Sequence, residues 1–236
     1  MQDPLFYQLF DSESSTYTYL LADAELKEAI LIDPVLEHVE RDLKLISELG
    51  LVLRYVLDTH IHADHITGAG EIRKRTGATA VVGAGAKVNC ADKLLEEGDE
   101  IRFGKHALCA IETPGHTDSC MSYLIGDRVF TGDALLARGT GRTDFQQGSS
   151  AKLYDSITRK LFRLPDETLV FPAHDYKGVT HTSIGEEKKH NPRIAGNTEA
   201  QFTEIMSSLN LAQPKKIAES VPANLACGKV ASKSAP

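Results

Sequence analysis

The chain has 236 residues, of which 42% are hydrophobic and 25% are charged, as is usual for a globular domain with a full core. Its formal net charge of −7 argues against a general nucleic-acid-binding role, which requires a basic face. No apolar run approaches the roughly 20 residues that are needed to cross a bilayer, so no membrane association is expected.

The N-terminal sequence and the cysteines predict a cellular compartment. Met1 to Phe6 lacks the basic and apolar segments of a secretory signal, and it lacks the Arg-rich character of a transit peptide. We therefore expect a cytoplasmic, bacterial protein, with a processed organelle form as the alternative. The four cysteines form no C-x-x-C pair and are predicted to be reduced thiols; they are Cys90, Cys109, Cys120 and Cys227.

The predicted elements fall into two successive batches of strands and helices. In the first batch, strands are expected at residues 5–10, 16–21, 29–32, 51–57 and 79–82, with helices at 35–49 and 66–75. In the second, strands are expected at 100–103, 107–112, 121–125, 128–131 and 169–171, with helices at 150–164 and 198–209. This order predicts an α/β protein (α+β in some schemes) with two sheets between helices.

We expect one domain over residues 1–236. Residues from about 178 to 236 are expected to form a short C-terminal extension that packs on it, with a loose tail from Ser232 to Pro236.

A dense group of metal-binding residues directly follows the predicted strand at 51–57. Within six residues it contains His60, His62, Asp64 and His65. Neutral imidazoles and carboxylates are ligands for zinc and iron(II). The sequence therefore predicts a metal site at the end of this strand.

Three further residues occur at strand ends, each beside a Gly or Pro turn: His116, Asp133 and His174. Taken alone, each could be an ordinary turn residue. Because loops at strand ends converge on one edge of a sheet, we expect all seven residues to share one site.

The ordered set T-H-x-H-x-D-H, H, D, H resembles the metallo-β-lactamase superfamily, over residues from about 16 to 176. The resemblance implies an αββα sandwich of two mixed sheets flanked by helices, with metals along one edge. In the superfamily's pattern one metal takes His60, His62 and His116. The other takes Asp64, His65 and His174, and Asp133 bridges the two.

Local strings favour one branch of this superfamily. Residues 132–148, 172–176, 191–193 and 210–224 are similar to the persulfide dioxygenase (ethylmalonic-encephalopathy-type) branch, although Thr140 stands where some relatives have a cysteine. That branch oxidises glutathione persulfide with O₂ to sulfite and glutathione at one iron(II) per chain. The alternative is the glyoxalase II type, a dinuclear-metal glutathione thioester hydrolase with a longer C-terminal domain. A non-catalytic metal-binding or redox-sensing protein is a third hypothesis, against which the complete ligand set argues.

The resemblance to the dioxygenase branch implies that His60, His116 and Asp133 bind the iron. Three coordination positions of the iron would then stay open. The remaining residues of the set are predicted to support these ligands by hydrogen bonding, namely His62, Asp64, His65 and His174. Asp58 is expected either to orient a ligand histidine or to act as a turn or cap residue.

Glutathione carries two carboxylates, which predicts cationic residues in the substrate site. Arg142 is the first candidate, followed by Arg138 and Lys177, for which a solvated surface charge is the competing interpretation. Tyr176 is predicted to donate a hydrogen bond to substrate or to be a packed loop residue, and Arg193 to be a structural ion-pair partner. The expected partners are glutathione persulfide and O₂. The branch commonly forms dimers, so a homodimer is included among the expected assemblies.

Overall fold

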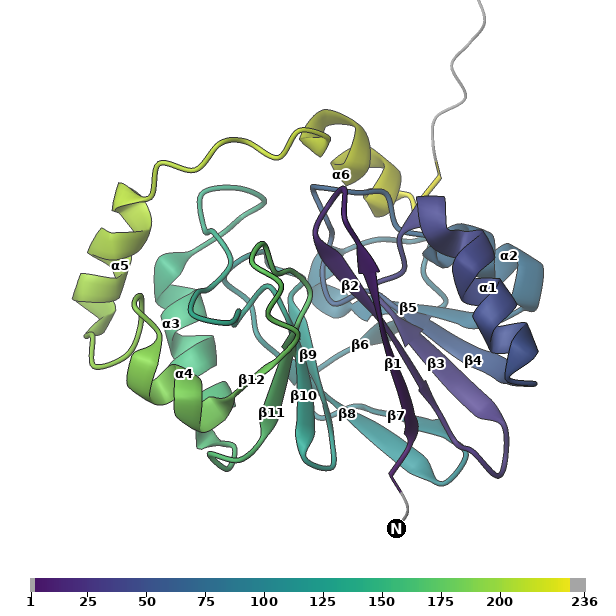
Figure 1. Cartoon of the computed structure of the whole chain (residues 1–236). Coiled ribbons are helices and arrows are strands. Elements are labelled where there is room, and N and C mark those ends of the chain that lie inside the picture. The colour runs from purple at the N-terminus through teal and green to yellow at the C-terminus, as the bar shows by residue number, and fades with distance from the viewer. Residues whose placement is uncertain (1–2, 230–236) are drawn as a thin grey trace, which may run out of the picture.

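Two six-stranded sheets lie face to face in the computed structural model, which describes residues 3–229 (Figure 1). The first sheet consists of β1 (Leu5–Asp11), β2 (Thr16–Ala22), β3 (Glu28–Ile32), β4 (Val52–Leu57), β5 (Thr79–Gly83) and β6 (Lys93–Leu95). The second consists of β7 (Glu100–Phe103), β8 (His106–Glu112), β9 (Met121–Ile125), β10 (Arg128–Gly132), β11 (Leu169–Pro172) and β12 (Thr182–Ser183).

Both sheets are mixed. In the first, β1, β2 and β3 pair antiparallel, and β3 to β6 pair parallel. In the second, β7 to β10 and the β11–β12 pair are antiparallel, and β10 pairs parallel with β11. The parallel pairs matter for function, because they bring the carboxyl ends of β3 and β4, and of β10 and β11, to the same edge.

Helices cover the outer face of each sheet (Figure 1). The first sheet is covered by α1 (Val39–Glu48) and α2 (Ala69–Thr76), and the second by α3 (Ser150–Arg159), α4 (Ile184–His190) and α5 (Glu199–Ser208). A last helix, α6 (Ile217–Leu225), is joined to α5 by a segment that runs across both halves of the molecule (Figure 1). The predicted αββα sandwich is thus confirmed.

The side chains of β2 alternate between two hydrophobic cores. Tyr19 and Leu21 enter the core between the sheets, whereas Leu20 and Ala22 pack beneath the helices of the first sheet. Successive side chains of a strand point to opposite faces, so a strand buried on both faces is apolar throughout. The central core includes Phe130, whose ring centroid lies 4.9 Å from that of Tyr19.

Several element boundaries differ from the prediction. The expected helix at 35–49 begins as a 3-10 turn, Leu36–His38, and that at 66–75 begins only at Ala69, whose N–H donates to the Thr67 hydroxyl. Prediction missed β6, β12, α4 and α6. In α6, Pro222 obscured the helical signal because proline is disfavoured within helices.

Residues 184–206 of the expected C-terminal extension contribute Ile184, Phe202 and Met206 to the outer core of the second sheet. Assignment of the whole chain to one domain stays a prediction. The expected tail at Ser232–Pro236 lies outside the described residues. Among residues 3–229, no helix has the length and apolar character to cross a membrane.

Candidate metal centre

The seven predicted residues come together where strand ends converge. His60 follows β4, His116 follows β8, Asp133 follows β10 and His174 follows β11. The structure gathers their potential ligand atoms into two groups, each with all its atoms within 4.8 Å of one another. The first group, here called the triad, contains His60, His116 and Asp133, and the second contains His62, Asp64, His65 and His174.

The triad histidines are oriented by oxygen atoms on their outer sides. His116 Nδ1 lies 2.6 Å from the carbonyl oxygen of Arg142 and must donate to it, so Nε2 is the nitrogen left to bind a metal. His116 Nε2 lies 3.7 Å from Asp133 Oδ2. His60 Nδ1 contacts the Thr59 hydroxyl at 3.0 Å. A contact to Nδ1 therefore orients each ring, as is usual for metal-binding histidines.

The charges of the triad suit a divalent cation. Burial lowers the pKa of His60 well below its usual value, so the ring is neutral. Burial raises the pKa of Asp133, but the nearby His174, His116 and His60 rings lower it by more, so this residue is a carboxylate. Two imidazoles and one carboxylate are a donor set that fits iron(II) or zinc.

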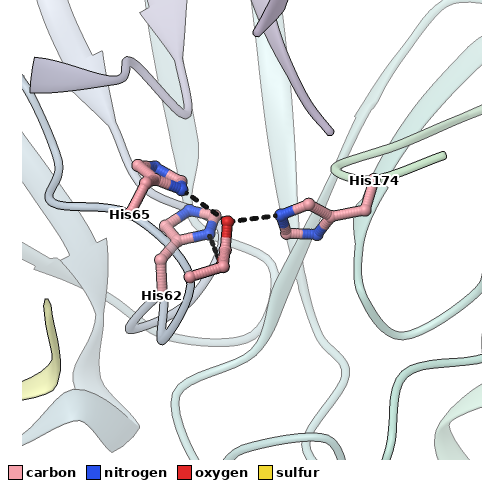
Figure 2. A group of neighbouring side chains, drawn as sticks. His62, His65 and His174 are labelled. Carbon is pink, nitrogen blue, oxygen red and sulfur yellow. Dashed lines mark hydrogen bonds and ion pairs between the residues drawn. The ribbon is translucent and has the colours of Figure 1, made fainter. Parts of the chain in front are cut away.

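His174 connects the second group to the triad. Its Nδ1 lies 2.6 Å from Asp133 Oδ1, and its Nε2 lies 3.0 Å from Asp64 Oδ2. Asp64 Oδ2 also lies 2.8 Å from His65 Nδ1. Figure 2 shows the rings of His65 and His174 facing each other across the site. Burial lowers the pKa of His174, but Asp133 and Asp64 raise it well above its usual value. A protonated His174 therefore joins the two carboxylates.

Two nitrogen atoms of the second group lack a hydrogen-bond partner, although one of them, His62 Nδ1, lies 4.0 Å from Asp64 Oδ1. His62 Nδ1 and His65 Nε2 are buried and make no hydrogen bond in the described structure. Buried polar atoms without partners are uncommon, and a bound cation or water would satisfy them. The ligand atoms of His62 lie with those of the second group, although the His62 ring centroid is only 4.0 Å from that of His60. The donor set thus fits one metal ion in the triad and has room for a second.

Asp33 is a site residue that the sequence did not reveal. This buried residue at the end of β3 accepts hydrogen bonds from Thr59 N at 2.7 Å and Thr59 Oγ1 at 2.9 Å, and it lies 3.1 Å from His62 Nε2. Asp58, the candidate from sequence, accepts from the Thr67 hydroxyl instead. The available signal was that Asp33 directly follows a strand, since the other site residues also lie in loops that follow strands.

Asn224 of α6 is a second residue that was missed. Its side-chain nitrogen donates to the carbonyl oxygens of His62 at 2.9 Å and His65 at 2.8 Å, and its oxygen accepts from Thr67 N. A helix near the C-terminus thereby holds the loop that carries the histidines. No local pattern around Asn224 indicates this contact.

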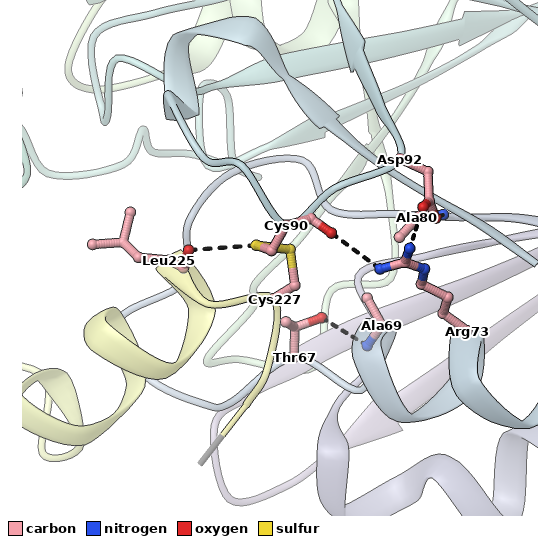
Figure 3. The surroundings of a disulfide bond; sticks show 8 residues. All are labelled: Thr67, Ala69, Arg73, Ala80, Cys90, Asp92, Leu225 and Cys227. Carbon is pink, nitrogen blue, oxygen red and sulfur yellow. Dashed lines mark hydrogen bonds and ion pairs between the residues drawn. A yellow bond between two sulfur atoms is a disulfide. The ribbon is translucent and has the colours of Figure 1, made fainter. Parts of the chain in front are cut away.

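A disulfide fixes the end of the same helix (Figure 3). Cys90, between β5 and β6, bonds to Cys227, which follows α6 and is 137 residues further along the chain. The prediction of four reduced thiols is therefore wrong for this pair, while Cys109 and Cys120 are free. Spacing could not reveal the bond, because neither cysteine belongs to a short motif.

Gly141 allows the backbone to lie in close contact with His116 and Asp133 of the triad. Its N–H donates to the carbonyl oxygen of Asp133 at 2.6 Å. A Cβ atom at this position would lie 2.4 Å from that oxygen and 2.8 Å from His116 Cγ. Only glycine fits without displacing a triad residue.

We therefore expect Gly141→Ala to lower metal content at least tenfold, because misplaced metal ligands lose affinity. Gly139→Ala is the matched control, since a Cβ there would meet its nearest atom at 3.9 Å. Metal per chain, measured by atomic emission after purification, distinguishes the two variants. Equal metal content in both would contradict the assigned role of Gly141.

A cavity of about 590 Å³ opens beside the triad. Its walls include all four predicted substrate contacts, Arg138, Arg142, Tyr176 and Lys177. Residues 211–216, within the segment between α5 and α6, form another wall. Tyr176 is 71% exposed and its ring is nearly parallel to that of His174, with the centroids 6.3 Å apart.

Two of the four predicted contacts already have partners. Arg142 donates from Nε and Nη2 to the Asp144 carboxylate, both at 2.7 Å, and to the carbonyl oxygens of Leu211 and Ala212. It therefore anchors the wall segment. Arg138 is paired with Glu186. Their roles in substrate binding stay predictions.

Comparison with known proteins identifies the family. The model of the metallo-beta-lactamase superfamily matches residues 12–174. The chain belongs to this superfamily. The human protein "Persulfide dioxygenase ETHE1, mitochondrial" is 50% identical over 229 residues, covering 95% of this chain and 89% of that protein, and the mouse protein of the same name is also 50% identical over the same shares.

A solved structure points to the same branch. The crystal structure of ETHE1 from Myxococcus xanthus is 60% identical, covers 95% of this chain and 100% of that chain, and has a TM-score of 0.94. These similarities confirm the predicted persulfide dioxygenase branch of the metallo-β-lactamase superfamily. Together with the two groups of ligand atoms they support a metal cofactor.

Proposed function

We propose that this protein is a persulfide dioxygenase that oxidises glutathione persulfide with O₂ to sulfite and glutathione, using one iron(II) bound by His60, His116 and Asp133. The observation that carries the proposal is the triad itself, in which two histidines and one carboxylate place their ligand atoms within 4.8 Å. It lines a cavity that also contains several cationic side chains. The persulfide dioxygenases among its relatives support the same reaction.

The reaction balances with one water molecule: persulfide, O₂ and water give thiol, sulfite and two protons. Both atoms of O₂ are reduced as the outer sulfur is oxidised to the sulfite level, and the sulfur–sulfur bond breaks. Iron(II), when bound, would supply neighbouring open positions for O₂ and for the persulfide sulfur. Three protein ligands leave these positions free, whereas a fuller ligand set would block them.

The other residues of the site position and shield this chemistry. The Arg142 carbonyl and the Thr59 hydroxyl keep the two histidine rings oriented. His174 holds the Asp133 carboxylate from one side. We propose that Lys177 and Tyr176, which line the same cavity, contact the substrate.

A dinuclear thioester hydrolase of the glyoxalase II type is the second candidate. It is favoured by the unpartnered His62 Nδ1 and His65 Nε2, which a second metal ion would satisfy. In that case both groups of residues would hold a metal ion, and the metals would supply an activated water for hydrolysis of the thioester.

Metal analysis and an oxygen electrode separate the two candidates. The dioxygenase is expected to contain about one iron per chain and to consume O₂ when glutathione persulfide is added. Two metals per chain, with hydrolysis of a glutathione thioester and no O₂ uptake by iron-loaded protein, would establish the second candidate instead.

Compartment and assembly also belong to the proposal. We propose that the protein is cytoplasmic, and we propose a homodimer as its assembly. The Cys90–Cys227 bond argues against a cytoplasmic location, because disulfides are rare in reducing compartments.

A further inference from the structure

Arg193 differs from the other cationic residues around the cavity. Arg142 is paired with Asp144, Arg138 with Glu186, and Lys216 with Glu13 and Glu37. Lys177 and Lys215 are exposed to solvent. Arg193 is partly buried, and within residues 3–229 no carboxylate oxygen lies within 4.0 Å of it, so the structural ion pair expected from the sequence does not form.

The environment of Arg193 makes an unpaired charge costly. Burial lowers the pKa of its guanidinium below the usual value, and no acidic group offsets the effect. Buried charges are normally paired because desolvation is expensive. An anion that enters the cavity would supply the missing partner.

Arg193 is also held close to the triad. Its Nη1 donates to the carbonyl oxygen of Thr140, and its backbone N–H donates to Asn191 Oδ1 at 3.0 Å. Thr140 is followed by Gly141, which packs directly on His116 and Asp133. The guanidinium therefore lies along the same wall of the cavity as the triad. Within the part of the chain that the structure describes, only its Nη1 donates hydrogen bonds, both to Thr140.

We propose that Arg193 binds a carboxylate of the persulfide substrate and selects persulfides that carry one. This inference rests on the proposed function and names a specificity-determining residue for it. The planar guanidinium can donate two parallel hydrogen bonds to a carboxylate, which an ammonium group cannot. Arg142 and Arg138 would first have to give up existing partners to do the same.

The kinetic test compares two persulfides. Arg193→Gln is expected to raise KM for glutathione persulfide about 30-fold or more, with kcat nearly unchanged, because a charged hydrogen bond to bound substrate is lost. For a persulfide without a carboxylate, such as 2-hydroxyethyl persulfide, KM should be the same in wild type and variant. Arg193→Lys, which keeps the charge without the planar fork, should fall between the two. Arg159→Gln on the outer helix α3 is the control.

A binding measurement separates this inference from the proposed reaction. Calorimetry with S-methylglutathione, which cannot be oxidised as a persulfide, is expected to show at least tenfold weaker binding to iron-loaded Arg193→Gln and intermediate binding to Arg193→Lys. If wild type oxidises no persulfide, the proposed function fails, while calorimetry still decides the role of Arg193. Unchanged S-methylglutathione binding in both variants, or an equal rise of KM for the persulfide without a carboxylate, would overturn the inference.

Discussion

Asp133→Asn is expected to contain less than about one-tenth of the wild-type iron and to lose at least a hundredfold in kcat/KM for O₂ uptake. Losses from replacing residues that merely orient a ligand are typically 10- to 100-fold, and Asp133 provides the only carboxylate of the triad. The substitution removes the negative charge that balances the cation while it preserves the shape of the side chain. Iron is measured by atomic emission and activity by an oxygen electrode.

Asp64→Asn provides the matched control for this variant. Asp64 also contacts His174, at 3.0 Å, but it lies in the second group. With one iron in the triad, Asp64→Asn should retain iron while Asp133→Asn loses it. If both variants lose metal to the same extent, the triad is not the single iron site.

Breaking the Cys90–Cys227 disulfide is expected to lower the free energy of unfolding by about 2 to 5 kcal/mol. A crosslink between residues 137 positions apart restricts the unfolded chain strongly, and the chain-entropy estimate increases with loop length. The bond also fastens the end of α6, whose Asn224 holds the histidine loop. Urea unfolding of Cys90→Ser under oxidising conditions measures the loss.

The control for this prediction is Cys109→Ser, which removes a free cysteine from β8. It should unfold at nearly the wild-type urea concentration. Wild type treated with reductant should match Cys90→Ser, and thiol labelling of the denatured protein should rise from two groups to four. Identical unfolding of wild type with and without reductant would contradict the expected contribution of the bond.

The sequence by itself predicted most of the residues that the structure brings together at the candidate metal centre. His60, His116 and Asp133 could be recognised because each lies in a loop that follows a strand, where loops of different strands converge. The spacing of apolar residues predicted both batches of strands and helices, since each pattern reports a local periodicity. The resemblance carried by residues 132–148 identified the branch, which the relatives then confirmed.

Only the tertiary structure decided which distant residues support that centre. Asp33 contacts His62, Asn224 contacts the carbonyl of His65, and Cys90 bonds to Cys227, across separations that no local pattern encodes. The partners of two arginines were also decided only by the fold. Arg142 is bonded to Asp144 and the wall segment, whereas Arg193 lines the cavity without an acidic partner among residues 3–229. Whether a charged side chain is paired depends on what the fold packs beside it.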